Sequence, residues 1–109
     1  MEDKRSVSLR AEHDGEDHRY LDAYVDDAGD LVLAGQDLGP ATKLVSDNGE
    51  YEWFRTIRSE HVPALVFALG GDAGADVLGV LAAAWTGPAS YDLEALLRDG
   101  AVPSDVHVV

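Results

Sequence analysis

The sequence predicts an α+β domain in which an antiparallel sheet of four to five strands carries three helices packed on one face. Segments with period-two hydrophobic alternation precede Ser59, and segments with helical periodicity follow it. A β-branched segment, Asp105–Val109, then returns to the sheet and gives the order β-β-β-β-α-α-α-β. The 109 residues suit a single domain spanning residues 1–109.

A hairpin is predicted for the first two strands. Val7, Leu9 and Ala11 alternate with polar residues that include Arg10, and Asp14-Gly15 supplies a turn. Alternation resumes in the second strand from residue 18 to residue 25. Its aliphatic side chains belong to the core, and its tyrosines belong to the other face of the sheet.

The third strand begins at Leu31, after a turn at residues 26–30, and it ends at Gly39-Pro40. Gly35 interrupts the pattern of this strand and predicts either a β-bulge or a close backbone approach. A loop with a turn at residues 46–49 then leads to a fourth strand at residues 50–57. On this fourth strand Tyr51, Trp53 and Arg55 alternate with side chains of the opposite face.

Three helices are predicted after the fourth strand. Ser59 caps the first, Asp72 or Gly74 opens the second, and Ser90 caps the third. Trp53 and Trp85 are both predicted to be substantially buried. The inward-facing stripes of the three helices are Val62, Leu65, Val66 and Leu69; Val77, Val80, Leu81 and Ala84; and Leu93, Leu96 and Leu97.

Charge and composition exclude several function classes. The formal net charge of −13 opposes binding to nucleic acid and to anionic membranes. The chain has no cysteine, no secretory leader and no apolar run that could span a membrane, so we expect a cytoplasmic protein. A nucleophile elbow, a phosphate-binding loop and a metal-binding helix are also missing, so we expect a non-enzymatic protein without a cofactor.

Two motifs, Gly35-Gln-Asp-Leu-Gly39 and Glu50-Tyr-Glu-Trp53, resemble those of a family of small uncharacterised bacterial proteins. The resemblance covers residues 20–109. It implies no established activity, although some short proteins of this kind are similar to immunity proteins of toxin systems.

A ligand site is one interpretation of Gln36, Asp37, Tyr51 and Trp53, because polar groups at a strand end lie near aromatic faces. The alternative is that Gln36 and Asp37 only fix the path of the following loop. The His13–His18 segment is rich in metal-capable side chains, but it lacks the spacing of a calcium loop or a zinc helix. A solvated hairpin tip explains it, and no metal is predicted.

Acidic residues concentrate in the first two hairpins, which favours a module that binds a basic protein partner. The predicted contact residues are Tyr20, Asp22, Tyr24, Asp26 and Asp27. Two alternatives stay open: a small-molecule site near Gln36, and background acidity from salt adaptation. We expect a monomer or a homodimer.

Overall fold

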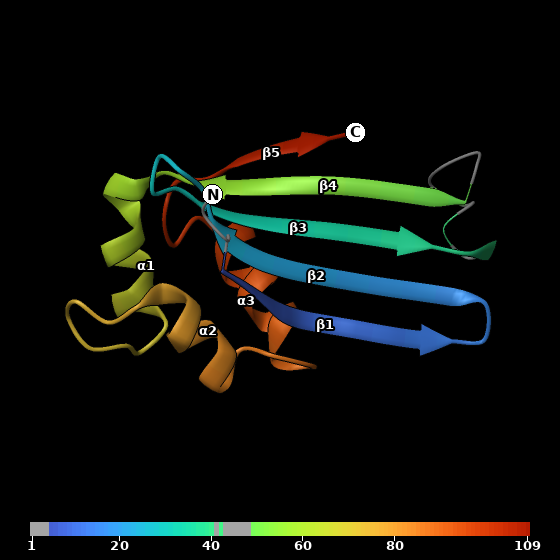
Figure 1. Cartoon of the computed structure of the whole chain (residues 1–109), viewed down its shortest axis with the longest axis horizontal. Helices are drawn as coiled ribbons and strands as arrows, with labels where there is room; N and C mark the ends of the chain where they lie inside the picture. Colours follow the sequence, from blue (N-terminus) through green and yellow to red (C-terminus); the bar gives the residue numbers. More distant parts are fainter. Residues whose placement is uncertain (1–4, 41, 43–48) are drawn as a thin grey trace.

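The computed structural model describes residues 5–40, 42 and 49–109. It contains one antiparallel sheet in the order β1-β2-β3-β4-β5, with the helices between β4 and β5 (Figure 1). The predicted α+β class and element order are confirmed. The strands are β1 (Ser6–Asp14), β2 (Asp17–Val25), β3 (Leu31–Leu38), β4 (Glu50–Ile57) and β5 (Asp105–Val108). The helices are α1 (Val62–Ala68), α2 (Val77–Ala84) and α3 (Ala89–Arg98), with a 3-10 turn at Ser59–His61.

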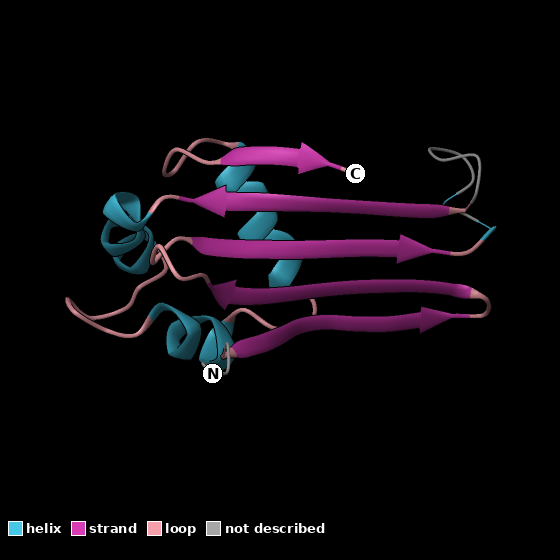
Figure 2. Ribbon diagram, turned by 45° about the horizontal axis from the view of Figure 1, so that its top comes forward, coloured by secondary structure: helices cyan, strands magenta, loops and turns pink. Residues whose placement is uncertain are grey.

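The helices cover only part of the sheet. Figure 2 shows α3 crossing one face, while α1 and α2 lie toward the end where β1 begins. We call the face that carries α3 the helix-side face and the other the open face. The strands β1 to β4 run well beyond the helices toward the β1–β2 turn, and we call that part, residues 12–20, 36–38 and 50–52, the distal half.

The hydrophobic core lies between the helix-side face and the helices. Buried leucines from every layer meet there, and each is at most 2% exposed: Leu9, Leu21, Leu31, Leu33, Leu65, Leu78, Leu81, Leu93 and Leu97. Trp53 and Trp85 pack against this cluster but are only partly buried. In the described part of the chain, no helix is long and apolar enough to cross a membrane.

Of the two interpretations of Gly35, the bulge is wrong. Pairing of β3 with β2 and with β4 is continuous through Gly35, and the irregularity instead lies in β1, between Ser8 and Arg10. A bulge shifts side-chain alternation by one residue. Arg10 and Glu12 therefore lie on the helix-side face, opposite Leu21 and Arg19, and not on the polar outer face that simple alternation predicts.

The predicted starts of all three helices are also wrong. Ser59 begins the 3-10 turn, and its backbone N–H donates to the carboxylate of Asp30. α1 starts three residues later, at Val62. Ser90 lies inside α3 and is fully buried. Asp76, and neither Asp72 nor Gly74, caps α2 by accepting a hydrogen bond from the N–H of Gly79. The turn predicted at residues 46–49 lies outside the described residues except for Gly49.

Candidate functional site

A row of charged and aromatic side chains crosses four strands on the helix-side face of the distal half. The register places Glu12 opposite Arg19, Arg19 opposite Asp37, and Asp37 opposite Tyr51. Directly opposed side chains begin about 5 Å apart, so successive members of the row are in contact range. One guanidinium therefore lies between two carboxylates, with a phenol ring at the end of the row.

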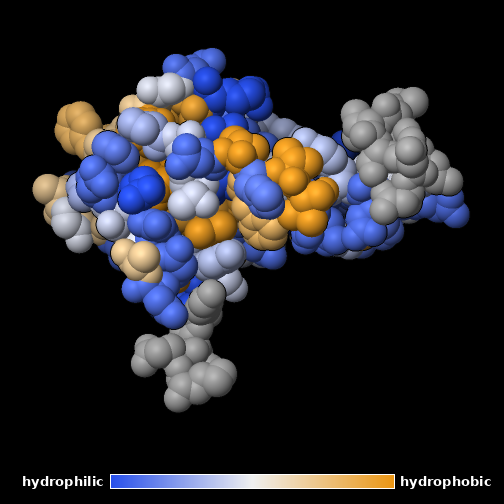
Figure 3. All heavy atoms as spheres, turned by 90° about the horizontal axis from the view of Figure 1, so that it is seen from above, coloured by the Kyte–Doolittle hydropathy of each residue, from blue (hydrophilic) through white to orange (hydrophobic). Residues whose placement is uncertain are grey.

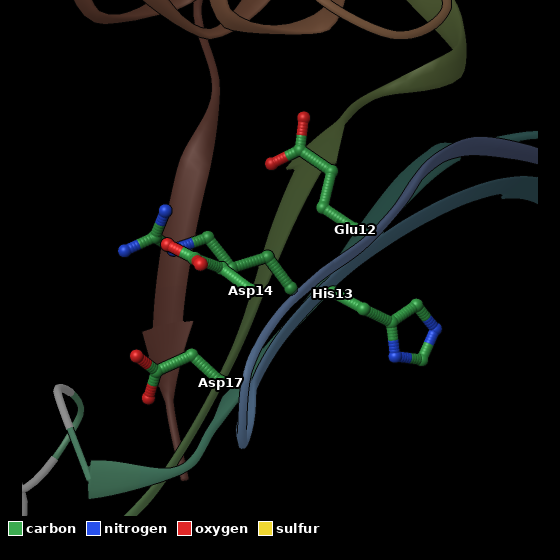
Figure 4. Close-up of a pocket in the computed structure, with 5 residues that line it drawn as sticks. Glu12, His13, Asp14 and Asp17 are labelled. Carbon is green, nitrogen blue, oxygen red and sulfur yellow. The ribbon is translucent and has the colours of Figure 1, made fainter.

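The carboxylates of β1 and β2 extend this row toward the tip of the sheet. Glu12, Asp14, Asp17 and Arg19, with the backbone of His13, surround a hollow of about 360 Å³. Figure 4 shows the carboxylates of Glu12, Asp14 and Asp17 on one side of the strands, whereas the imidazole of His13 points to the other side. The alternation of β-strand side chains thus separates the acids from the histidines.

The indole of Trp53 provides an aromatic surface next to this row. Its indole lies flat over Gly35 of the neighbouring strand, where an added Cβ would come within 2.2 Å of the Trp53 ring. The glycine is required for this close approach and not for a positive φ. Trp53, Tyr51, Arg55, Glu94 and Val106 line a second hollow of about 230 Å³.

A buried network fixes the position of α3 against β1 beside the site. Arg10 donates to the hydroxyl of Ser90 at 3.0 Å and forms an ion pair with Glu94, and the two charged side chains are 5% and 18% exposed. The guanidinium carbon of Arg10 lies 3.6 Å from the ring centre of Tyr91, whose hydroxyl donates to Glu12. Each polar group has a partner, as a buried charge requires.

The electrostatics of the site reflect its partial enclosure. Burial raises the pKa of Asp37, although the positive charges of Arg19 and Arg10 oppose this effect. Burial also raises the pKa of Tyr91, and its hydrogen bond to Glu12 adds to the rise. Burial lowers the pKa of Arg55, whose Nη1 donates to Ser104 at 2.8 Å. The surface therefore combines exposed or half-buried acids at its rim with Asp37, a partly desolvated carboxylate, at its centre.

The structure brings together three of the four residues predicted to form a ligand site. Asp37, Tyr51 and Trp53 share the helix-side face. Gln36 lies on the open face, with Tyr20 and Glu52 as its cross-strand partners. The adjacent positions of Gln36 and Asp37 in a strand place their side chains on opposite faces, so one ligand cannot contact both there.

The residues predicted to meet a partner occupy a different surface. Tyr20, Asp22 and Tyr24 lie on the open face of β2, and Asp26 and Asp27 lie in the turn that follows. Asp26 accepts hydrogen bonds from the N–H groups of Ala28 and Asp30, so it shapes this turn. This turn and the β1–β2 turn are at opposite ends of a nine-residue strand, roughly 30 Å apart. The acids that are close in sequence therefore form two separate surfaces.

The histidines of the distal half form a ring cluster on the open face. His13 and His18 are directly opposed, with ring centres 4.4 Å apart, and Tyr20 stacks parallel to His18. Within the described ranges, no group of three or more histidine and carboxylate side chains is arranged to hold a metal ion. The carboxylates of Asp14 and Asp17 point to the opposite face (Figure 4).

Arg10, Glu94 and Tyr91 contribute to the site but were not among the predicted functional residues. The contacts of Arg10 with Ser90 and Glu94 span 80 and 84 residues, so local periodicity contains no sign of them. The bulge that turns Arg10 inward occurs in a segment without glycine. The only available signal was an arginine next to core positions of β1.

Comparison with protein-family models, with curated proteins and with solved structures finds no match for this chain.

Proposed function

We propose that this protein is a non-enzymatic binding module, immunity-like or regulatory, which holds a basic protein partner on the helix-side face of its distal half. One observation carries the proposal. Glu12, Asp14, Asp17 and Asp37 gather on one surface, and the aromatic rings of Tyr51 and Trp53 border it. We place the module in the cytoplasm, because a chain without cysteine gains nothing from an oxidising compartment.

Carboxylates beside aromatic rings are well suited to arginine and lysine side chains. A carboxylate accepts two parallel hydrogen bonds from a guanidinium, and an aromatic face attracts a cation above it. The net charge of −13 adds long-range attraction and accelerates encounter with a basic protein. Asp37 is the group with most to gain, because a partner cation would offset the loss of solvation that raises its pKa.

The distribution of charge favours this function over background acidity from salt adaptation. Among the described residues of the distal helix-side surface, Arg19 is the only cation beside four carboxylates. Acidic residues that result from salt adaptation would be spread over every exposed surface and would not be concentrated on this one. The proposal therefore depends on the position of the acids as well as on their number.

A metabolite site near Asp37 and Tyr51 is the second candidate. The hollow beside Tyr51 and Trp53 supports it, because Arg55 and Glu94 place opposite charges around an aromatic surface. Its volume of about 230 Å³ is below the ~300–1,000 Å³ of typical ligand pockets. A side chain of a protein partner fits this space better than a whole metabolite does. A metabolite-library thermal-shift screen, in which one chemical class raised the melting temperature by several degrees, would favour the second candidate.

A pull-down from a lysate of the source cells, at low and at high salt, tests the proposed function. The distal variant carries Asp14→Asn, Asp17→Asn and Asp37→Asn. The comparison variant carries the same charge change on the other acidic surface, through Asp22→Asn, Asp26→Asn and Asp27→Asn. Circular dichroism first establishes that both variants are folded.

We expect the wild type and the comparison variant to capture the same basic protein at low salt, and the distal variant to lose it. High salt should weaken capture, because it screens the exposed carboxylates. Loss in the comparison variant alone would move the site to the open face and the β2–β3 turn. Equal capture of many proteins, or capture of none, would contradict a specific binding function.

A further inference from the structure

Arg55 carries a positive charge for which the described residues provide no ion-pair partner. It lies on the helix-side face of β4, opposite Val106 of β5, and its Nη1 donates to the hydroxyl of Ser104 at 2.8 Å. Its Nε is buried and has no hydrogen-bond partner among the described residues. Burial lowers the pKa of Arg55, because its charge has lost contact with water and has not gained an equivalent partner.

The hollow beside Arg55 has an excess of positive charge. Of the described residues that line it, only Glu94 is acidic, and the carboxylate of Glu94 already forms an ion pair with Arg10. Arg98, on the same helix as Glu94, adds a further positive charge that acts on Arg55. Three guanidinium groups and one carboxylate therefore determine the local field, in a protein whose net charge is −13. An anionic group is the ligand that this field favours.

Apolar and aromatic side chains form the walls of the same hollow. Tyr51, Trp53 and Val106 line it together with the charged residues, around a volume of about 230 Å³. Val106 and Val108, which is opposite Trp53 in the register, are each 50% exposed. Figure 3 looks onto the β5 side of the molecule, where hydrophobic residues gather in the middle of the visible surface. A carboxylate attached to an apolar body matches both the walls and the charge.

The hollow is continuous with the acidic surface of the distal half. Tyr51 belongs to both, because it is opposite Asp37 in the charged row and also lines the hollow. Arg55 follows Tyr51 by four residues on the same face of β4, which corresponds to roughly 13 Å. An extended segment of about five residues spans this distance. One short segment can therefore reach Asp37 with a basic side chain and Arg55 with a carboxylate.

We propose that the hollow beside Arg55 receives a carboxylate of the basic partner, borne by a segment whose arginine or lysine side chains contact the distal acids. This inference rests on the proposed function. The guanidinium of Arg55 donates to the carboxylate, and an apolar side chain of the segment packs against Trp53 and Val106.

The charge of the whole protein favours a carboxylate of the partner over a free anion. A net charge of −13 repels a small anion in solution. A carboxylate attached to a basic segment is instead brought to Arg55 at high effective concentration, because the distal acids hold the rest of the segment. Arg55 thus determines specificity, since it favours a partner of mixed charge over a uniformly basic one.

Two peptides that differ in a single group test the proposal. Both have an acetylated N-terminus and four arginines followed by a C-terminal phenylalanine, and one ends in a free carboxylate whereas the other ends in an amide. The amide peptide has the higher net positive charge, so an acidic surface without an anion site would bind it at least as tightly. We expect the opposite order: in isothermal titration calorimetry, the carboxylate peptide should bind the wild type at least about threefold more tightly.

Substitutions of two arginines identify the group that causes the preference. Arg55→Met removes the charge, keeps an apolar side chain, and should abolish the preference for the carboxylate peptide. Arg58→Met makes the same charge change at an exposed arginine just after β4, and this matched control should keep the preference. Circular dichroism first establishes that both variants are folded, and the comparison of the two peptides on the wild type needs no substitution.

The outcomes separate this proposal from the function on which it rests. The anion site is overturned, and the basic-partner function is retained, if both peptides bind, the distal variant weakens both, and the amide peptide binds as tightly as the carboxylate peptide. A preference that persists in Arg55→Met also overturns the site. If neither peptide binds, the proposal is overturned together with its premise that the distal acids hold basic segments. N-acetylphenylalanine that binds as tightly as the carboxylate peptide would make the hollow a metabolite site and would overturn a carboxylate of the partner.

Discussion

Gly35→Ala should displace the indole of Trp53 and weaken the fold. An added Cβ would lie within 2.2 Å of the ring, which is far closer than any real contact, so the indole must leave the surface of β3. Truncating a buried tryptophan costs about 3–5 kcal/mol, and losing roughly half of this burial costs about 2 kcal/mol. Alanine is intrinsically better than glycine in a strand by about 0.5–1 kcal/mol, so the net loss should be about 1–1.5 kcal/mol.

A double-mutant cycle isolates this contact. In a Trp53→Ala background the clash is gone, so Gly35→Ala should instead stabilise the protein by about 0.5–1 kcal/mol. Urea unfolding followed by circular dichroism measures the four free energies of unfolding. If Gly35→Ala is equally destabilising with and without Trp53, then the glycine is required by the backbone conformation and not by the indole. The reasoning about the contact between Trp53 and Gly35 would then be wrong.

Three further results follow from the same geometry. Glu94→Gln leaves the guanidinium of Arg10 buried without its counter-charge and should cost about 2–4 kcal/mol in urea unfolding. Arg5→Ala at an exposed ion pair should cost much less, and equal costs would contradict the assigned burial. Burial raises the pKa of the Asp37 carboxyl group, so this group keeps its proton to a higher pH in the folded state than in the unfolded chain. The free energy of unfolding therefore falls as the pH rises from the unfolded pKa through the folded pKa. Asp37→Asn should therefore raise the free energy of unfolding at neutral pH and change it little at acid pH, and the opposite pattern in pH-dependent unfolding would contradict this sign. Trp85→Phe should cost much less than Trp85→Ala, because no described residue forms a hydrogen bond with the buried Nε1 that the phenylalanine would lose; similar melting temperatures for the two variants would refute this.

Hairpins and strand faces could be predicted from the sequence because both depend on neighbouring residues. Glycine-containing turns separate the strands, and the alternation in β2 assigns Leu21 and Ala23 to the core, where they are fully buried. Tyr51 and Trp53 were likewise placed on one face by period two alone. These features require no knowledge of what lies across the sheet.

The parts of the site that depend on distant residues could not be predicted. The bulge in β1 contains no glycine, and it is favoured by the burial of Leu9 in the hydrophobic core and of Arg10 against α3, about 80 residues away. The close approach of Trp53 explains Gly35, for which local reasoning left a bulge and a close approach open and could not name the approaching group. Clustering of acids along the chain was also misleading, because successive hairpin turns lie at opposite ends of the sheet.

The two indole N–H signals in a nitrogen–proton NMR spectrum test the central claim most directly. Trp53 borders the distal helix-side surface, whereas Trp85 lies at the end of α2, so each signal reports on a different part of the molecule. An arginine-rich peptide serves as the probe, and Trp85→Phe assigns the signals. We predict that saturating peptide shifts the Trp53 signal and leaves the Trp85 signal in place, and that Asp14→Asn, Asp17→Asn and Asp37→Asn together abolish this shift. Saturable binding that leaves the Trp53 signal unchanged would contradict the account.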